Sequence, residues 1–140
     1  MQFSKDVSAI GRYFRRRRNQ YMEAFGLKSI HALYLIDVCQ SPGISQDKLA
    51  QRLGIDKSNV ARQVAILEEN ALLIRKPSTE DKRMLCLFPT EKTLTLLPNL
   101  QEAMQDWENA ALGGLSTEEK KQLLTLIAKV RLRTEGSGTE

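Results

Sequence analysis

The densest group of charge in the sequence is four consecutive arginines, Arg15 to Arg18, within the stretch GRYFRRRRNQY. Guanidinium groups bind phosphates and carboxylates, so this run could hold a polyanion such as nucleic acid. Apolar residues recur through the same region at heptad-like spacing, which predicts a helix. The residues of this apolar seam are Phe3, Val7, Ile10, Phe14 and Tyr21.

The helix limits what the arginine run can do. Consecutive helical residues fan around the axis, so four arginines in a row cannot all face one line of phosphates. Their aliphatic stems can instead cover neighbouring apolar surface while the charged ends stay in water. The run is therefore interpreted as a solvated helix face, with phosphate contact or anion binding as the alternative.

A less charged stretch, DKSNVARQ at 56–63, carries side chains that suit the edges of DNA bases. Arg62 could bind O6 and N7 of guanine, and Gln63 could bind N6 and N7 of adenine. Ser58 and Asn59 could bond phosphates or base edges, and Lys57 is expected to hold a phosphate. This stretch is therefore predicted to recognise the DNA sequence by contacting base edges.

The residues around this stretch predict two short helices in tandem. Ser45 and Asp56 can each cap the start of a helix, and Gly54 permits the positive φ of a tight turn between them. Ala50 provides a small side chain where the helices cross, and Val60 provides an apolar contact. The pattern is typical of a helix-turn-helix. Ser45 and Gln46, at its entrance, are also candidate DNA contacts.

Two apolar runs, LLIRK and MLCLF, follow the helix-turn-helix and are separated by the polar stretch PSTEDKR. They predict a β-hairpin, so the fold class is mostly α with a small β-hairpin wing. Lys82 and Arg83 would lie at the exposed tip, where a guanidinium can enter a narrow minor groove. Asp81 is expected to orient the wing by pairing with Arg75 or Arg83.

These motifs, in this order, resemble the winged helix-turn-helix core of the MarR (multiple-antibiotic-resistance regulator) family. The matching residues are Leu67, Glu68, Ile74, Arg75, Asp81, Arg83 and Thr90. Three places depart from the family pattern: Ala71-Leu72 replaces Gly-Leu, Pro89 precedes Thr90, and Thr93 stands where glycine is usual.

The resemblance implies one domain over residues 1–134, with the winged helix-turn-helix core at about 28–90. It also implies N- and C-terminal dimerisation helices, at about 1–24 and 90–134, that intertwine with those of a second subunit. The sequence STEE, at 116–119, is a capping box that predicts the start of the last helix. Residues 135–140 are expected to be a disordered tail.

As a member of this family the chain would be a sequence-specific DNA-binding transcriptional regulator, expected to be a repressor. A homodimer would bind an inverted-repeat operator in double-stranded DNA, with Arg75 among the contacts. The alternative is a helical protein-interaction module or antirepressor that has the same fold but binds no DNA. Such a protein would be expected to lack Arg62 and Arg83, and both are present.

The resemblance also implies an effector pocket between the dimer helices and the winged core. Tyr13, Arg16, His31 or Tyr34 could meet a small phenolic or carboxylate effector there. His31 could instead be a structural histidine. The cysteine of the family's hydroperoxide sensors, in the first helix, has no counterpart in this sequence.

Composition excludes several other classes of protein. The chain has 140 residues, is 41% hydrophobic and carries a net charge of +4, which permits a polyanionic partner without requiring one. No apolar run could span a bilayer and no signal core is visible, so a cytoplasmic protein with no membrane partner is expected. Cys39 and Cys86 are expected to be small buried hydrophobic residues. With one histidine and no paired carboxylates, neither an enzyme, a metal site nor a cofactor is indicated.

Overall fold

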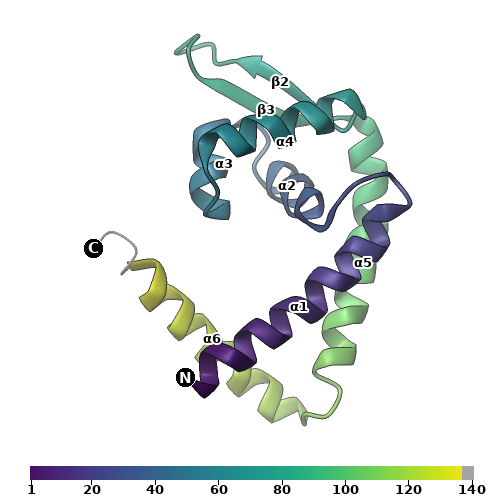
Figure 1. Ribbon diagram of the computed structural model, residues 1–140, viewed down its shortest axis with the longest axis vertical. Helices are drawn as coiled ribbons and strands as arrows, with labels where there is room; N and C mark the ends of the chain where they lie inside the picture. Colours follow the sequence, from purple (N-terminus) through teal and green to yellow (C-terminus); the bar gives the residue numbers. More distant parts are fainter. Residues whose placement is uncertain (137–140) are drawn as a thin grey trace. The chain divides into compact units, whose positions relative to one another are not determined.

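The computed structural model describes residues 1–136, and within them the chain forms six helices and one small antiparallel sheet (Figure 1). The elements are α1 (Gln2–Glu23), α2 (Ser29–Gln40), β1 (Ile44–Ser45), α3 (Gln46–Leu53), α4 (Lys57–Glu69), β2 (Leu73–Pro77), β3 (Leu85–Pro89), α5 (Glu91–Ala111) and α6 (Thr117–Gly136). The predicted fold class is confirmed. The chain divides into two compact units, residues 1–104 and the chain from Gln105 onward, so α5 contributes to both.

The helix-turn-helix is formed by α3 and α4, as predicted. The Ser45 hydroxyl accepts a hydrogen bond from the Lys48 N–H at 3.1 Å and so caps α3. Gly54 ends α3 in the left-handed conformation with φ of 64°. Ala50 and Val60 are buried where the two helices meet. The turn therefore has the small and flexible residues that close packing requires.

The wing belongs to a three-stranded antiparallel sheet in the order β1-β3-β2. The predicted hairpin pairs β2 with β3, so that Leu73 lies opposite Pro89 and Pro77 opposite Leu85. The sequence did not predict β1, in which Ile44 pairs with Leu87. This two-residue strand joins the wing to the start of α3, because Ser45 is both its last residue and the N-cap of α3.

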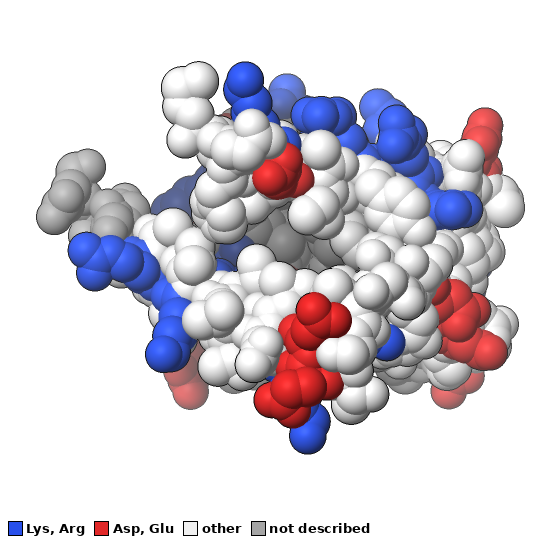
Figure 2. Space-filling view, turned by 90° about the horizontal axis from the view of Figure 1, so that it is seen from below, with Lys and Arg blue, Asp and Glu red and all other residues white. Residues whose placement is uncertain are grey.

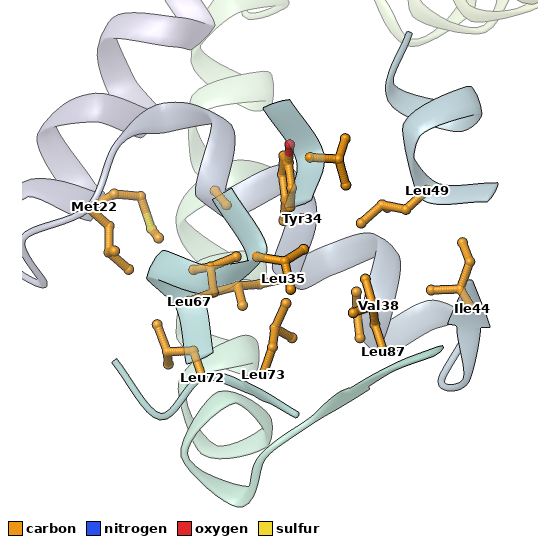
Figure 3. Close-up of a cluster of buried hydrophobic side chains, with 14 of the residues drawn as sticks. Met22, Tyr34, Leu35, Val38, Ile44, Leu49, Leu67, Leu72, Leu73 and Leu87 are labelled. Carbon is orange, nitrogen blue, oxygen red and sulfur yellow. The ribbon is translucent and has the colours of Figure 1, made fainter. Parts of the chain in front are cut away.

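A cluster of buried apolar side chains holds α2, α4 and the sheet together (Figure 3). Tyr34, Leu35 and Val38 of α2 are fully buried, as are Leu67 of α4 and Leu87 of β3. Burying each such side chain stabilises the fold by about 1.5–3 kcal/mol. The helix α4 is thus anchored to the core through its buried side chains. Within residues 1–136, the Tyr34 hydroxyl is buried without a hydrogen-bond partner.

Two of the three departures from the family pattern, Ala71-Leu72 and Thr93, meet at the turn between α4 and β2. Ala71 has φ of 59° and is the one non-glycine residue with positive φ among the described residues. The Thr90 hydroxyl donates to the Ala71 carbonyl at 2.7 Å. The Thr93 hydroxyl donates to the Leu72 carbonyl at 2.5 Å and is completely buried. Two threonine hydroxyls therefore bind the carbonyls of a turn that tolerates alanine.

The unit from Gln105 onward contains the end of α5 and all of α6. The Ser116 hydroxyl accepts from the Glu119 N–H at 3.1 Å, and the Glu119 carboxylate accepts from the Ser116 N–H at 2.9 Å. The predicted capping box is confirmed. The helix α6 continues through Glu135 and Gly136, so the expected disorder is wrong for these two residues. The rest of the expected tail, 137–140, lies outside the described residues.

Two further expectations concern burial. Cys39 and Cys86 are only half-buried, so the prediction that both are buried is wrong. Cys39 lies near the end of α2, and partial burial raises the pKa of its thiol. Among the described helices, none is long and apolar enough to cross a membrane.

Candidate nucleic-acid interface

The first two turns of α4 carry half of the side chains predicted to contact DNA. Lys57, Ser58 and Arg62 are exposed and Asn59 is half-buried. Lys57 Nζ lies 3.4 Å from an Asp47 carboxylate oxygen, but both side chains are mostly exposed and such a pair holds weakly. Within residues 1–136, the Arg62 guanidinium makes no hydrogen bond or ion pair, although Asp56 attracts it. Arg62 is thus available to a ligand.

Asp56 occupies the N-cap position of α4, but its side chain does not cap a first-turn amide. That part of the prediction is wrong, because the carboxylate accepts a hydrogen bond from the Ser58 hydroxyl instead. This bond, followed by nearby N–H groups of the first turn and by Arg62, lowers the pKa of Asp56. Asp56 is therefore ionised at neutral pH. Ser58 must release its hydroxyl hydrogen from Asp56 before it can donate to a phosphate.

Gln63, predicted to bind adenine, is half-buried and makes hydrogen bonds within the protein. Its side-chain oxygen lies 2.7 Å from Nε2 of His31 on α2, and its amide nitrogen donates to Asn59 Oδ1 at 3.3 Å. Nδ1 of His31 accepts the Lys28 N–H at 2.9 Å. The contact with adenine that the sequence suggests for Gln63 would compete with these bonds. Nothing in the sequence indicates this connection, because His31 and Gln63 are 32 residues apart.

The tip of the wing has the arrangement that the sequence predicts. Asp81 accepts from both Nε and the main-chain N–H of Arg83, at 3.2 and 3.1 Å. The Arg83 side chain is 93% exposed, so the pair orients the guanidinium without burying it. Lys82 is also exposed. The alternative pairing of Asp81 with Arg75 is wrong.

Arg75 connects the wing to the helix-turn-helix. Its guanidinium lies 2.8 Å from the Glu68 carboxylate of α4 and donates to the Gln46 side chain of α3 at 2.8 Å. The Arg75 side chain is 23% exposed. The DNA contacts expected of Arg75, Gln46 and the capping residue Ser45 stay predictions, because all three make bonds within the domain. In the sequence Glu68 stands out only as part of a motif, and no local pattern there indicates its pair with Arg75.

The arginine run lies on α1, away from these elements in sequence, and its members have different surroundings. Arg17 stacks over the Tyr13 ring, with its guanidinium carbon 5.3 Å from the ring centre. Arg18 donates to the Ser29 hydroxyl at 3.3 Å, and its burial and the neighbouring Arg15 lower its pKa. Arg15 and Arg16 are exposed. The four side chains do not form one row. On the face drawn in Figure 2, basic side chains project in several groups and acidic ones form groups of their own.

The residues suggested for an effector differ in their access to solvent. His31 and Tyr34 are buried, with ring centres 6.4 Å apart, whereas Tyr13 is half-buried and Arg16 is exposed. A surface hollow of about 390 Å³ lies instead between α1 and the start of α2. It is lined by Arg15, Arg18, Asn19, Lys28, Ser29, Ile30 and Leu33. Effector binding by the four suggested residues stays a prediction. The hollow is lined by three basic side chains outside that set, Arg15, Arg18 and Lys28.

Comparison with known proteins identifies this arrangement. A family model described as the MarR family matches residues 27–85, which run from the start of α2 into β3. The chain is also 34% identical over 103 residues to the HTH-type transcriptional regulator YybA of Bacillus subtilis (strain 168), covering 74% of this chain and 69% of YybA. The chain belongs to the MarR family.

Other relatives agree with this assignment. The chain is 33% identical to the HTH-type transcriptional regulator BilQ of Clostridium symbiosum (strain WAL-14163), over 69% of this chain and 67% of BilQ. A MarR family transcriptional regulator from Listeria monocytogenes, solved in complex with a 26mer DNA, superposes with a TM-score of 0.88 at 29% identity. That likeness covers 95% of this chain and 89% of the Listeria chain. MarR family proteins are transcriptional regulators, as the sequence predicts for this chain.

Proposed function

We propose that the protein is a homodimeric transcriptional repressor that binds an inverted repeat in double-stranded DNA. The observation that carries this proposal is the exposed start of α4, where Arg62 projects without an ion pair among residues 1–136. A free guanidinium at the start of the second helix of a helix-turn-helix suits guanine in the major groove. The similar Listeria protein was solved with DNA, which supports the same ligand here.

The site divides into residues that read bases and residues that hold the backbone. Arg62 and Asn59 would face base edges, whereas Lys57 would bind a phosphate. Arg83, oriented by Asp81 at the tip of the wing, would enter the adjacent minor groove. Arg75 would act indirectly, by holding the wing against α3 and α4.

A dimer would supply the symmetry that an inverted repeat requires. On α1, the side chains of Phe3, Val7 and Ile10 are 57%, 46% and 56% exposed. On α6, Leu124, Leu126 and Ile127 are also exposed, and no residue of this helix is buried. Apolar helical surface of this kind is typical of a subunit interface. Two reading helices related by a two-fold axis would lie in successive major grooves, about 34 Å apart.

Release by a small carboxylate is the corresponding proposal for regulation. The hollow between α1 and α2 carries Arg15, Arg18 and Lys28, which suit an anionic effector better than the buried rings of His31 and Tyr34 do. An effector bound in this hollow would contact the start of α2, and α2 packs against α3 and β3. A cytoplasmic protein, as expected from the sequence, would meet both DNA and such metabolites.

The proposal is tested by selecting bound sites from a random pool of DNA duplexes with the purified full-length protein. We expect an inverted repeat whose half-sites are about 10 base pairs apart, or a multiple of this spacing. Light scattering of the complex should give two chains per duplex. Recovery of no enriched sequence at physiological salt, from protein that is folded, would overturn the proposal.

A further inference from the structure

A chain of hydrogen bonds runs from the main chain before α2 to the reading helix. The Lys28 N–H donates to Nδ1 of His31, and Nε2 of His31 contacts Gln63 Oε1 at 2.7 Å. Gln63 Nε2 then donates to Asn59 Oδ1 at 3.3 Å. His31 is 2% exposed, so water does not compete for its ring. This series of hydrogen bonds ends at Asn59, one turn before Gln63 on α4.

The direction of every bond in this chain follows from its first member. A main-chain N–H can only donate, so Nδ1 of His31 must be bare and Nε2 must carry the hydrogen of a neutral ring. Burial lowers the pKa of His31, which keeps the ring neutral at physiological pH. Nε2–H therefore requires the oxygen of Gln63. That choice turns the amide nitrogen of Gln63 toward Asn59, which must in turn offer its oxygen.

The fixed direction of these bonds determines which group Asn59 presents at the surface of α4. Because Asn59 Oδ1 is occupied, its side-chain nitrogen is left to act on a ligand, and among residues 1–136 this nitrogen has no hydrogen-bond partner. Asn59 Oδ1 keeps a second lone pair, but its bond to Gln63 holds it turned along α4, so the group that Asn59 presents to a ligand is its nitrogen, a donor. In the major groove, guanine offers the acceptors N7 and O6, adenine N7 and thymine O4, whereas cytosine offers only the donor N4.

We propose that His31 is a positioning residue that fixes the polarity of the Gln63–Asn59 pair, so that Asn59 selects against cytosine at one base pair of each half-site. This inference rests on the proposed function, since it requires α4 to lie in the major groove. Without the Nε2–H of His31, Gln63 can turn over. Asn59 can then reverse and offer its oxygen to cytosine.

The experiment uses the full-length protein and its selected operator. Asn59→Ala first identifies the base pair that Asn59 contacts, as the one position whose preference is lost. Dissociation constants are then measured on four duplexes that differ only there, for the original protein, His31→Phe and Gln63→Leu. Tyr34→Phe is the matched control, because it also lies in the buried part of α2 and removes a hydroxyl that has no partner among the described residues.

We expect the original protein and Tyr34→Phe to bind the cytosine duplex about five- to tenfold more weakly than the best duplex, which is the effect of one hydrogen bond. His31→Phe and Gln63→Leu should each reduce this ratio to less than about twofold. The double variant should reduce it no further, because both changes break the same chain. Preferences at all other positions should remain.

A variant with an amide donor separates hydrogen bonding from ring packing. His31→Gln can still donate to Gln63 Oε1, so it should restore discrimination, and unfolding curves will show which variants fold. If His31→Phe does not fold, Gln63→Leu and His31→Gln still decide the matter. Full discrimination in Gln63→Leu, loss of it in His31→Gln, or no effect of Asn59→Ala would each overturn the inference. Failure of the original protein to select any sequence would instead overturn the proposed function.

Discussion

Ala71 shows how one residue can depart from a family pattern while the turn keeps its conformation. Its φ of 59° is the left-handed conformation, which costs alanine about 1–2 kcal/mol and glycine almost nothing. The hydroxyls of Thr90 and Thr93 bind the carbonyls of Ala71 and Leu72 and hold the turn in place. The departures at 71 and 93 therefore belong to one local structure.

Ala71→Gly should raise the free energy of unfolding by up to about 1 kcal/mol. The change removes the left-handed strain but adds about 0.5–1 kcal/mol of backbone entropy that is lost on folding. Urea denaturation measures the difference. Gly54→Ala is the matched control, since Gly54 has φ of 64° and open space for a Cβ, and it should destabilise by about 1 kcal/mol. Destabilisation by Ala71→Gly would contradict the assignment of strain.

The stability of the protein should fall as the pH decreases below about 6.5, in part through His31. Burial lowers the pKa of the folded-state ring from its ordinary value of 6.5. Below 6.5 the unfolded chain therefore binds a proton that the folded chain excludes, which favours unfolding by at most about 1.4 kcal/mol per pH unit. The difference in unfolding free energy between the original protein and His31→Gln should shrink from pH 7.5 to 5.5. A constant difference would contradict the buried, neutral ring.

Single residues were predictable where their partners are close in sequence. Ser45, Ser116 with Glu119, and Asp81 with Arg83 act within three residues of one another, and the structure confirms their contacts. Gln63 and Arg75 were assigned to DNA because their types suit bases and phosphates. Gln63 contacts His31, 32 residues away, and Arg75 contacts Gln46, 29 residues away, and no local pattern reveals these two contacts.

Among the elements, the helices and the hairpin could be predicted because their apolar periodicity extends over several residues. The strand β1 could not, since two residues give no alternation to detect. It forms because Ile44 and Ser45 meet the free edge of β3. The wing is consequently bound to the helix-turn-helix both by this strand and by Arg75.

Arg75→Ala should lower the free energy of unfolding by about 1–2 kcal/mol, because it removes bonds to Glu68 and Gln46 that are partly shielded from water. It should also weaken operator binding by loosening the wing. Lys82→Ala, at the exposed tip, is the control and should leave stability within about 0.5 kcal/mol. Thermal unfolding and operator binding are measured on both variants. Unchanged stability in Arg75→Ala would contradict the connecting role.

At the scale of the whole molecule, the apolar seam of α1 should determine assembly. Ile10→Asp places a charge on surface that a second subunit would cover, so dimers should dissociate at concentrations at least tenfold higher than for the original protein. Light scattering over a dilution series measures this change. Lys5→Asp, a charge change at an exposed position of the same helix, is the control. Equal assembly of Ile10→Asp and the original protein would exclude this seam from the interface.

The central claim is that α4, and not the arginine run of α1, reads DNA. The measurement is a salt titration of binding to the selected operator and to a scrambled duplex, for Arg62→Ala and for a variant with Arg15 and Arg16 changed to Gln. Arg62→Ala should cost about 1–3 kcal/mol on the operator and remove preference at one position per half-site. The double variant should keep the preferred sequence and change the slope of log K against log salt by much less than about 0.9 per arginine. Loss of sequence preference in the double variant, with preference intact in Arg62→Ala, would contradict the account.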